Sequence, residues 1–223
     1  MTTTNLPPML VHFPLTRAGV LVLGDLVVPP GATRIVVFAH GSGSSRQSPR
    51  NQWVARRLQE AGYGTLLVDM LSREEMDSPR CVERLRFNVP GLVERLVEIV
   101  DTIGGRPDTR DLPVVLFGAS TGAAAALVTT FARPRRVVSV ISRGGRVDLA
   151  SHVNARIQVP VLLLVGANDP AVLSLNRTEL ARLPRGELQV IPGAGHLFEE
   201  PGALDAVAEA TVRWAGAEVG APA

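Results

Sequence analysis

A serine lies between two glycines at the point where an apolar run becomes alanine-rich. The run VVLF (residues 114–117) leads into Gly-Ala-Ser-Thr-Gly, with Ser120 at its centre, and then into AAAALV. A Gly-x-Ser-x-Gly turn between a strand and a helix is typical of a nucleophile elbow, which holds the serine above the sheet. A serine hydroxyl reacts well only when a base takes its proton, so the turn predicts a histidine and a carboxylate elsewhere.

Two later side chains follow apolar runs in the same way. Asp169 comes after VLLLVGAN (residues 161–168), and His196 comes after LQVIPGAG (residues 188–195). The order is serine, acid, histidine, with separations of 49 and 27 residues. The carboxyl ends of parallel strands share one edge of a sheet, where ligands bind. We therefore expect Ser120, His196 and Asp169 to meet there as nucleophile, base and orienting acid.

Two backbone N–H groups are candidates for an oxyanion hole. Thr121 follows the serine and begins the expected helix, whose N-terminus favours negative charge. The loop GSGSSR follows the apolar run that ends at His40, and it would supply the second N–H, from Ser42. We expect His40 itself to hold this loop in place.

The acid has competitors. Asp148 also lies in a loop after an apolar run, that of the preceding strand, so Asp148 stays open as an alternative to Asp169. Asp69 also follows a strand-like run, but it precedes the serine in the chain.

The elements that must position these residues alternate between strands and helices. Strands are expected at residues 19–28, 34–40, 64–70, 112–118, 135–142, 159–169 and 186–193, with a hairpin partner near residues 10–13. Helices are expected at residues 52–62, 90–105, 120–132, 171–183 and 201–215, and a polar stretch separates the third strand from the second helix. This alternation predicts an α/β fold, a three-layer doubly wound, mostly parallel sheet. We expect one domain over residues 1–223, with residues 216–223 as a frayed tail.

Composition narrows the class of protein. The 223 residues include 23 basic and 21 acidic side chains, and every basic one is arginine. The arginines are scattered rather than gathered in a stripe, which argues against a nucleic-acid partner. The single cysteine, Cys81, rules out a disulfide within the chain. No signal peptide or membrane-spanning run is recognised, so we expect a cytoplasmic protein without a membrane partner.

Cofactor and metal sites find little support. The serine turn lacks the Gly-x-Gly-x-x-Gly spacing of a dinucleotide site, and a chain without lysine cannot form a P-loop. No two histidines have the spacing of metal ligands; His12 and His152 are expected to be packing or surface residues. We expect no cofactor and no metal. Arg46 is expected to be a solvated loop residue rather than a ligand for an anionic substrate.

Four segments together resemble a known family. FAHGSGSSR, FGASTGAAAAL, VGAND and PGAGHLFEEPG are similar to the α/β-hydrolase fold, and more narrowly to its small, dienelactone-hydrolase-related serine hydrolases, over about residues 19–214. The resemblance implies Ser120 as nucleophile, Asp169 as acid and His196 as base. Dienelactone hydrolase itself uses a cysteine, whereas this elbow holds a serine, which favours ordinary ester chemistry over dienelactone.

The expected function is that of a serine hydrolase (carboxylesterase-like) that cleaves a small-molecule ester through an acyl-enzyme. The alternatives are a binding protein, a lyase or an acyltransferase that retains the triad. Only RGGRVDLASHVNARIQ (residues 143–158) follows the strand after the elbow helix, which leaves no room for a cap domain. We therefore expect an open, shallow site. The oligomeric state stays open.

Overall fold

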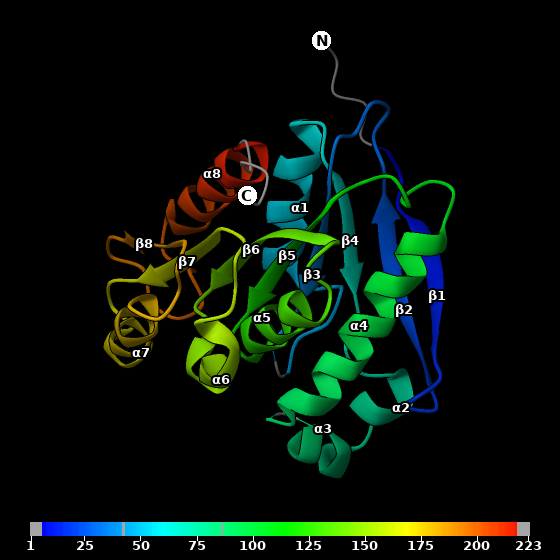
Figure 1. Cartoon of the computed structure of the whole chain (residues 1–223), viewed down its shortest axis with the longest axis horizontal. Coiled ribbons are helices and arrows are strands. Elements are labelled where there is room, and N and C mark those ends of the chain that lie inside the picture. Colours follow the sequence, from blue (N-terminus) through cyan, green and yellow to red (C-terminus); the bar gives the residue numbers. More distant parts are fainter. Residues whose placement is uncertain (1–5, 42, 86, 218–223) are drawn as a thin grey trace.

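The computed structural model describes residues 6–41, 43–85 and 87–217. Within these residues an eight-stranded sheet has the order β1-β2-β4-β3-β5-β6-β7-β8 (Figure 1). The strands are β1 (Met9–Leu15), β2 (Val20–Val27), β3 (Ile35–Ala39), β4 (Gly64–Val68), β5 (Val114–Ala119), β6 (Val137–Arg143), β7 (Val161–Gly166) and β8 (Gly186–Ile191). β1 and β2 form the expected antiparallel hairpin, β2 pairs antiparallel with β4, and the remaining pairs are parallel.

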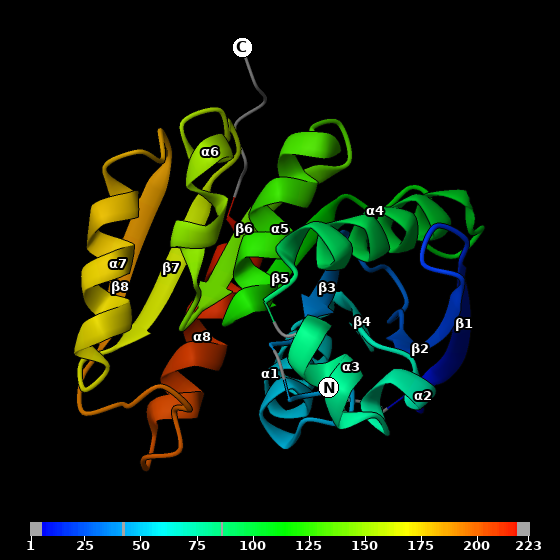
Figure 2. The same cartoon turned by 90° about the horizontal axis from the view of Figure 1, so that it is seen from below.

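The central strands are buried on both faces. Every residue of β3, β4, β5 and β7 is buried, which explains why these strands read as continuous apolar runs in the sequence. Helices α1 (Pro49–Glu60) and α8 (Ala203–Gly216) cover one face. Helices α4 (Val89–Gly105), α5 (Thr121–Ala132), α6 (Ser151–Asn154) and α7 (Pro170–Leu180) cover the other (Figure 2). The predicted doubly wound, mostly parallel sheet is confirmed.

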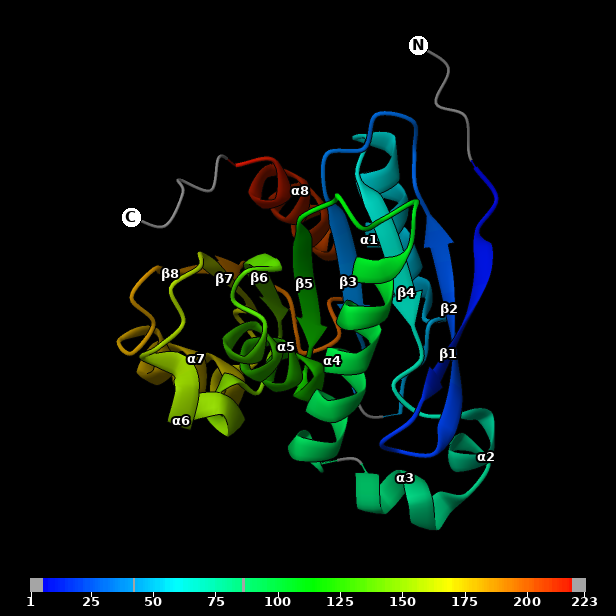
Figure 3. The ribbon, with the colours of Figure 1, turned by 45° about the vertical axis from the view of Figure 1, so that its right-hand side comes forward.

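Two short helices occupy the stretch between β4 and α4 that the sequence predicted only as polar. They are α2 (Arg73–Met76) and α3 (Pro79–Leu85), and they lie beyond the carboxyl ends of β3 and β4 (Figure 3). Ser72 begins α2 with a capping box, because its hydroxyl accepts the N–H of Glu75 while the Glu75 carboxylate accepts the N–H of Ser72. The same carboxylate is held by a bidentate ion pair from Arg95 on α4.

The connection between β6 and β7 is short. It contains only a 3₁₀ turn (Val147–Ala150) and α6, so the expectation that no cap domain is inserted there is confirmed. Of the predicted frayed tail, residues 218–223 lie outside the described residues, and α8 continues to Gly216. None of the helices described here combines the length and apolar character that a bilayer crossing requires.

Candidate active site

Ser120 occupies a strained turn between β5 and α5. Its backbone has φ 51° and ψ −121°, a conformation that residues other than glycine rarely adopt. Such strain persists only where the surrounding structure enforces it, and it is frequent at functional sites. The serine N–H donates to the carbonyl oxygen of Arg143 at 3.2 Å, and the serine carbonyl accepts the N–H of Arg146 at 3.0 Å. Ser120 is therefore fixed against the end of β6.

The two glycines of the elbow are required by close packing. A Cβ at Gly118 would lie 2.4 Å from the Cα of Ala123, and a Cβ at Gly122 would lie 2.1 Å from the carbonyl oxygen of Ala39. Both separations are far inside contact distance, so neither position accommodates a side chain. The buried alanines that follow the serine let α5 lie close to the sheet in the same way.

Asp169 and His196 are in direct contact. Nδ1 of His196 lies 2.6 Å from Oδ2 of Asp169. Asp169 is the N-cap of α7, where its other carboxylate oxygen accepts the N–H of Val172 at 3.4 Å. The carboxylate is largely buried, whereas the imidazole is 43% exposed. Because a carboxylate can only accept, Nδ1 carries the proton and Nε2 is left with a lone pair that can accept a proton from a hydroxyl.

The imidazole lies against the turn that follows β6. A Cβ at Gly144, where φ is +53°, would lie 3.5 Å from Nδ1 and from Cε1 of His196. The preceding residue is Arg143, whose carbonyl oxygen accepts the Ser120 N–H, so His196 and Ser120 flank the same turn. Within the described residues, no hydrogen bond joins Ser120 Oγ to the imidazole. Catalytic hydrogen bonds are often long before substrate binds, and the Ser120–His196 pair stays a prediction.

Asp148, the alternative acid, makes a different interaction. Its carboxylate forms a bidentate pair with the guanidinium of Arg146, at 2.9 and 2.8 Å. This hydrogen bonding lowers the pKa of Asp148, although partial burial opposes the shift. The contact with His196 is thus made by Asp169.

Of the two candidate oxyanion-hole residues, the structure describes one. Thr121 is buried at the first position of α5, directly after the serine. Ser42 lies outside the described residues. Its neighbour Gly41 passes close to Ser120, since a Cβ at Gly41 would lie 2.9 Å from Cβ of Ser120.

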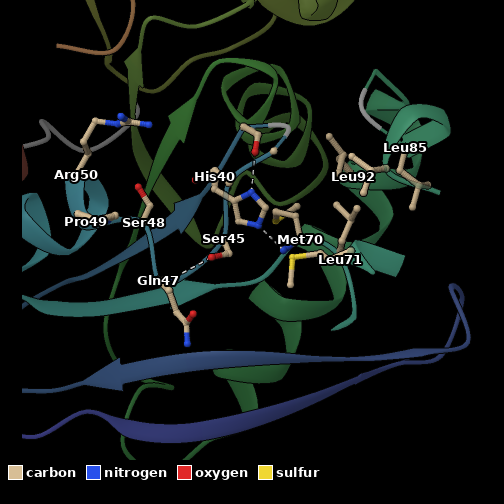
Figure 4. A pocket seen from close by; sticks show the side chains of 15 residues that line it. His40, Ser45, Gln47, Ser48, Pro49, Arg50, Met70, Leu71, Leu85 and Leu92 are labelled. Atoms are coloured by element: carbon tan, nitrogen blue, oxygen red, sulfur yellow. Dashed lines mark hydrogen bonds between the residues drawn. The ribbon is translucent and has the colours of Figure 1, made fainter. Parts of the chain in front are cut away.

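His40 links the loop after β3 to the end of β4. Its Nδ1 lies 2.8 Å from the carbonyl oxygen of Gly41, and its Nε2 accepts the Met70 N–H at 2.9 Å (Figure 4). Nδ1 therefore carries the proton and the ring is neutral. Burial lowers the pKa of His40, opposed by the hydrogen bond to Gly41. This is the loop-holding role that the sequence suggested.

Arg46 is not the solvated loop residue that the sequence predicted. Its backbone N–H donates to Asp69 at 2.8 Å, and its guanidinium lies 3.3 Å from a carboxylate oxygen of Asp69 and of Asp25. The arginine is largely buried by these contacts. It stabilises the loop, and Asp69 is its structural partner.

A cavity of about 540 Å³ is lined in part by Gly41, which lies against Ser120. Figure 4 shows its lining, which comes from the loop after β3 on one side and from α2, α3 and α4 on the other. The apolar wall consists of Met70, Leu71, Met76, Val82, Leu85 and Leu92. Its polar wall includes Ser44, Ser45, Gln47, Ser48 and Arg50. Helices α2 and α3, which the sequence analysis expected only as a polar stretch, form part of the wall of this cavity, and the open, shallow site stays a prediction.

The apolar residues of α2 and α3 were the signal that the sequence analysis missed. Val82 and Leu85 lie three residues apart on α3 and α2 contributes the single apolar residue Met76, but charged neighbours obscure the pattern. Cys81 lies on α3, half-buried against the core, and is a free thiol. In the part of the chain that the structure describes, no three His, Cys, Asp or Glu side chains are grouped to hold a metal ion.

Comparisons with known proteins agree with this architecture. The model of the family described as "Dienelactone hydrolase family" matches residues 24–217. A crystal structure named dienelactone hydrolase, from Anabaena variabilis, is 47% identical, with a TM-score of 0.89, and the match covers 94% of this chain and 97% of that one. Est1E from Butyrivibrio proteoclasticus shares the fold at 15% identity, with a TM-score of 0.76 over 94% of this chain and 98% of that one.

Curated relatives carry a different name. Two Mycobacterium tuberculosis proteins named "Putative phosphoribosyl transferase" are 49% identical over 195 residues, which is 86% of this chain. The chain spans 43% of the length of these relatives. The family model covers the sheet from the second half of β2 onward and the similar crystal structure covers 94% of the chain, and both support a hydrolase. This chain therefore belongs to the dienelactone hydrolase family, within the α/β-hydrolase fold.

Proposed function

We propose that this chain is a serine hydrolase that cleaves carboxylic esters of small molecules through an acyl-enzyme on Ser120. The observation that carries the proposal is the positive φ of Ser120 between two glycines that admit no side chain. The strained backbone does not stabilise the fold. It is the conformation that a nucleophile needs in order to project above the sheet. The contact between His196 and Asp169 at the same edge of the sheet supports it.

The proposed reaction has two halves. Ser120 Oγ attacks the ester carbonyl carbon as Nε2 of His196 takes the hydroxyl proton, and Asp169 stabilises the imidazolium. The N–H groups of Thr121 and Ser42 bind the negative oxygen of the tetrahedral intermediate. When it collapses, His196 gives the proton to the departing alcohol. Water then attacks the acyl-enzyme with His196 as base. The carboxylic acid product leaves, and the hydroxyl of Ser120 is regenerated.

The cavity suggests which part of the substrate is enclosed. Its apolar wall suits a short or medium hydrocarbon group, and its volume lies in the range of ordinary small-molecule sites. Because Gly41 belongs to its lining and also lies against Ser120, a group bound there would be adjacent to the reacting carbonyl.

Phosphoribosyl transfer is not proposed for this chain. That name belongs to proteins of which the chain spans less than half, whereas the similar crystal structure named dienelactone hydrolase is matched over nearly its whole length. A binding protein, a lyase or an acyltransferase with a retained triad would each be distinguished from a hydrolase by the experiment below.

The test is labelling with a fluorophosphonate probe, together with turnover of p-nitrophenyl acetate. We expect labelling and turnover in the wild type and in Ser174→Ala, a control at an exposed serine of α7, and neither in Ser120→Ala. Product analysis with and without an added alcohol separates hydrolysis from acyl transfer. Equal labelling of wild type and Ser120→Ala would overturn the proposal, and labelling without turnover would indicate a binding protein.

A further inference from the structure

Another cavity lies at the opposite edge of the sheet from the candidate active site. Its volume is about 570 Å³, and its lining includes Val137, the first residue of β6, and Arg185, which directly precedes β8. Ser120, Asp169 and His196 instead follow the carboxyl ends of β5, β7 and β8. The seven residues of β6 span about 20 Å, so a ligand in this cavity would be remote from Ser120.

The walls of this cavity are mostly apolar. The hydrophobic residues that line it are Phe131, Pro134, Val137, Val138, Ile157 and Val159. Val137 and Ile157 belong to the buried core, whereas the ring of Phe131, on the last turn of α5, is 39% exposed. A hydrocarbon group bound here would remove this apolar surface from water. The volume of the cavity lies in the range of ordinary small-molecule sites.

Three arginines, Arg135, Arg156 and Arg185, also line the cavity. The guanidinium of Arg156 is held at its wall by two contacts. Its Cζ lies 4.2 Å from the ring centre of Phe131, and its Nη2 donates to the carbonyl oxygen of His152 at 3.4 Å. A cation over an aromatic face is attracted by the ring, but its charge is not neutralised. One positive charge is therefore placed directly against the apolar wall.

Carboxylates pair with arginines nearby in the chain but not with these three. Arg133 is paired with Asp101, and the guanidinium of Arg182 lies 3.6 Å from a carboxylate oxygen of Glu179. Among the described residues, no carboxylate pairs with an arginine of the cavity, and no acidic residue lines it. The cavity thus combines an apolar wall with uncompensated positive charge. A ligand that complements both has a hydrocarbon body and an anionic head group, whose oxygens a planar guanidinium binds well.

We propose that this cavity binds an anionic amphiphile, a medium-length hydrocarbon chain that carries one carboxylate or phosphate head group. The chain would lie along the apolar wall, and the head group would accept hydrogen bonds from the guanidinium of Arg156. Arg135 and Arg185 would add electrostatic attraction. The inference does not rest on the proposed function, because the cavity shares no residue with the candidate triad or with the cavity lined by Gly41.

The test measures the affinities of three ten-carbon probes by isothermal titration calorimetry: decanoate, decyl phosphate and the neutral decanol. At least one of the two anions should bind about fivefold or more tightly than decanol, the scale of a solvent-accessible charge pair. The eight-carbon homologue of the favoured anion should bind about tenfold more weakly, because two fewer CH₂ groups are buried.

Matched variants assign the binding to this cavity. Arg156→Gln should lower the affinity of the favoured anion to near that of decanol, and Val159→Phe, which would fill part of the cavity, should weaken the anion and decanol alike. Arg177→Gln, at an exposed arginine of α7 outside the cavity, is the control and should bind like the wild type. Binding should also persist in Val82→Phe, a change in the wall of the other cavity. Circular dichroism checks that each variant is folded.

A photoreactive analogue locates the site directly. The favoured anion with a diazirine on its chain should label residues 130–138 or 156–159, as read by peptide mass spectrometry. The inference is overturned if only other residues or none are labelled, if decanol binds as tightly as both anions, or if Arg156→Gln keeps the full affinity. Binding to phosphatidylglycerol vesicles without binding of either free anion would also overturn it, since this face would then contact a membrane surface.

Discussion

His196 and Asp169 lie 27 residues apart in the chain, yet Nδ1 of the imidazole is 2.6 Å from a carboxylate oxygen of the aspartate. The contact fixes the tautomer that leaves Nε2 free to accept a proton. Asp169 is held in turn as the N-cap of α7, which limits its motion. The two residues thus form the part of the proposed triad whose geometry is already assembled.

Removing the carboxylate charge should therefore disable the proposed base. We expect Asp169→Asn to lower kcat for p-nitrophenyl acetate by about 10²- to 10⁴-fold, because the amide no longer selects the required tautomer or stabilises the imidazolium. Asp148→Asn is the matched control, since Asp148 pairs with Arg146, and its kcat should stay within about threefold of the wild type. A larger loss in the Asp148 variant than in the Asp169 variant would reverse the assignment of the acid.

The Gly122 position should tolerate no side chain. Gly122→Ala would place a methyl group 2.1 Å from the carbonyl oxygen of Ala39, and we expect a loss of about 3 kcal/mol or more in the free energy of unfolding. Gly105→Ala at the end of α4 is the control. Its methyl group would meet nothing within 4 Å, so denaturant unfolding should show no loss of stability. Equal stability of the two variants would contradict the close approach of α5 to β3.

The buried His40 should make stability depend on pH in a defined window. Its pKa in the folded protein lies below the ordinary value of 6.5, so below that pH the unfolded chain binds a proton that the folded chain does not. The free energy of unfolding should fall as the pH is lowered from about 7 to 5, above the range in which carboxylates such as Asp101 and Asp148 titrate. In His40→Gln this slope should be smaller, whatever the absolute stability, and an unchanged slope would exclude His40 as its source.

The cavity should determine which acyl groups are accepted. Val82 belongs to the part of the apolar wall that α3 forms, and Val82→Phe would fill part of the cavity beside it. We expect kcat/KM for p-nitrophenyl hexanoate to fall by about tenfold or more, and that for p-nitrophenyl acetate to change by less than about threefold, because a two-carbon group does not reach the wall. A uniform loss for both esters would indicate that the cavity is not the acyl site.

The fold could be predicted from local patterns because its central strands are buried on both faces. Runs such as residues 35–39 and 161–166 are apolar throughout; a glycine follows shortly after the first, and the second begins after Pro160 and ends at Gly166, which leaves little ambiguity. The elbow could also be predicted from its two glycines. A side chain at Gly118 or Gly122 would collide with neighbouring backbone, so a turn of this kind requires glycine on both sides of the serine.

The features that could not be predicted from the sequence depend on contacts between distant segments. Helices α2 and α3 are too short to show a clear helical repeat of apolar residues, and the pairing of Glu75 with Arg95 on α4 helps to hold α2 in place. Arg46 and Arg143 are both arginines near the ends of strands, and nothing local says that the first meets two carboxylates and that the second meets none among the described residues. These differences appear only once the tertiary structure is known.

The central claim is a covalent acyl group on one serine, and trapping that group tests it most directly. Enzyme quenched in acid during turnover of p-nitrophenyl acetate should carry one acetyl group, which peptide mass spectrometry should locate on Ser120. The account would be contradicted if turnover proceeded while the quenched protein carried no acyl group, or carried it on another residue such as Ser45 or Cys81.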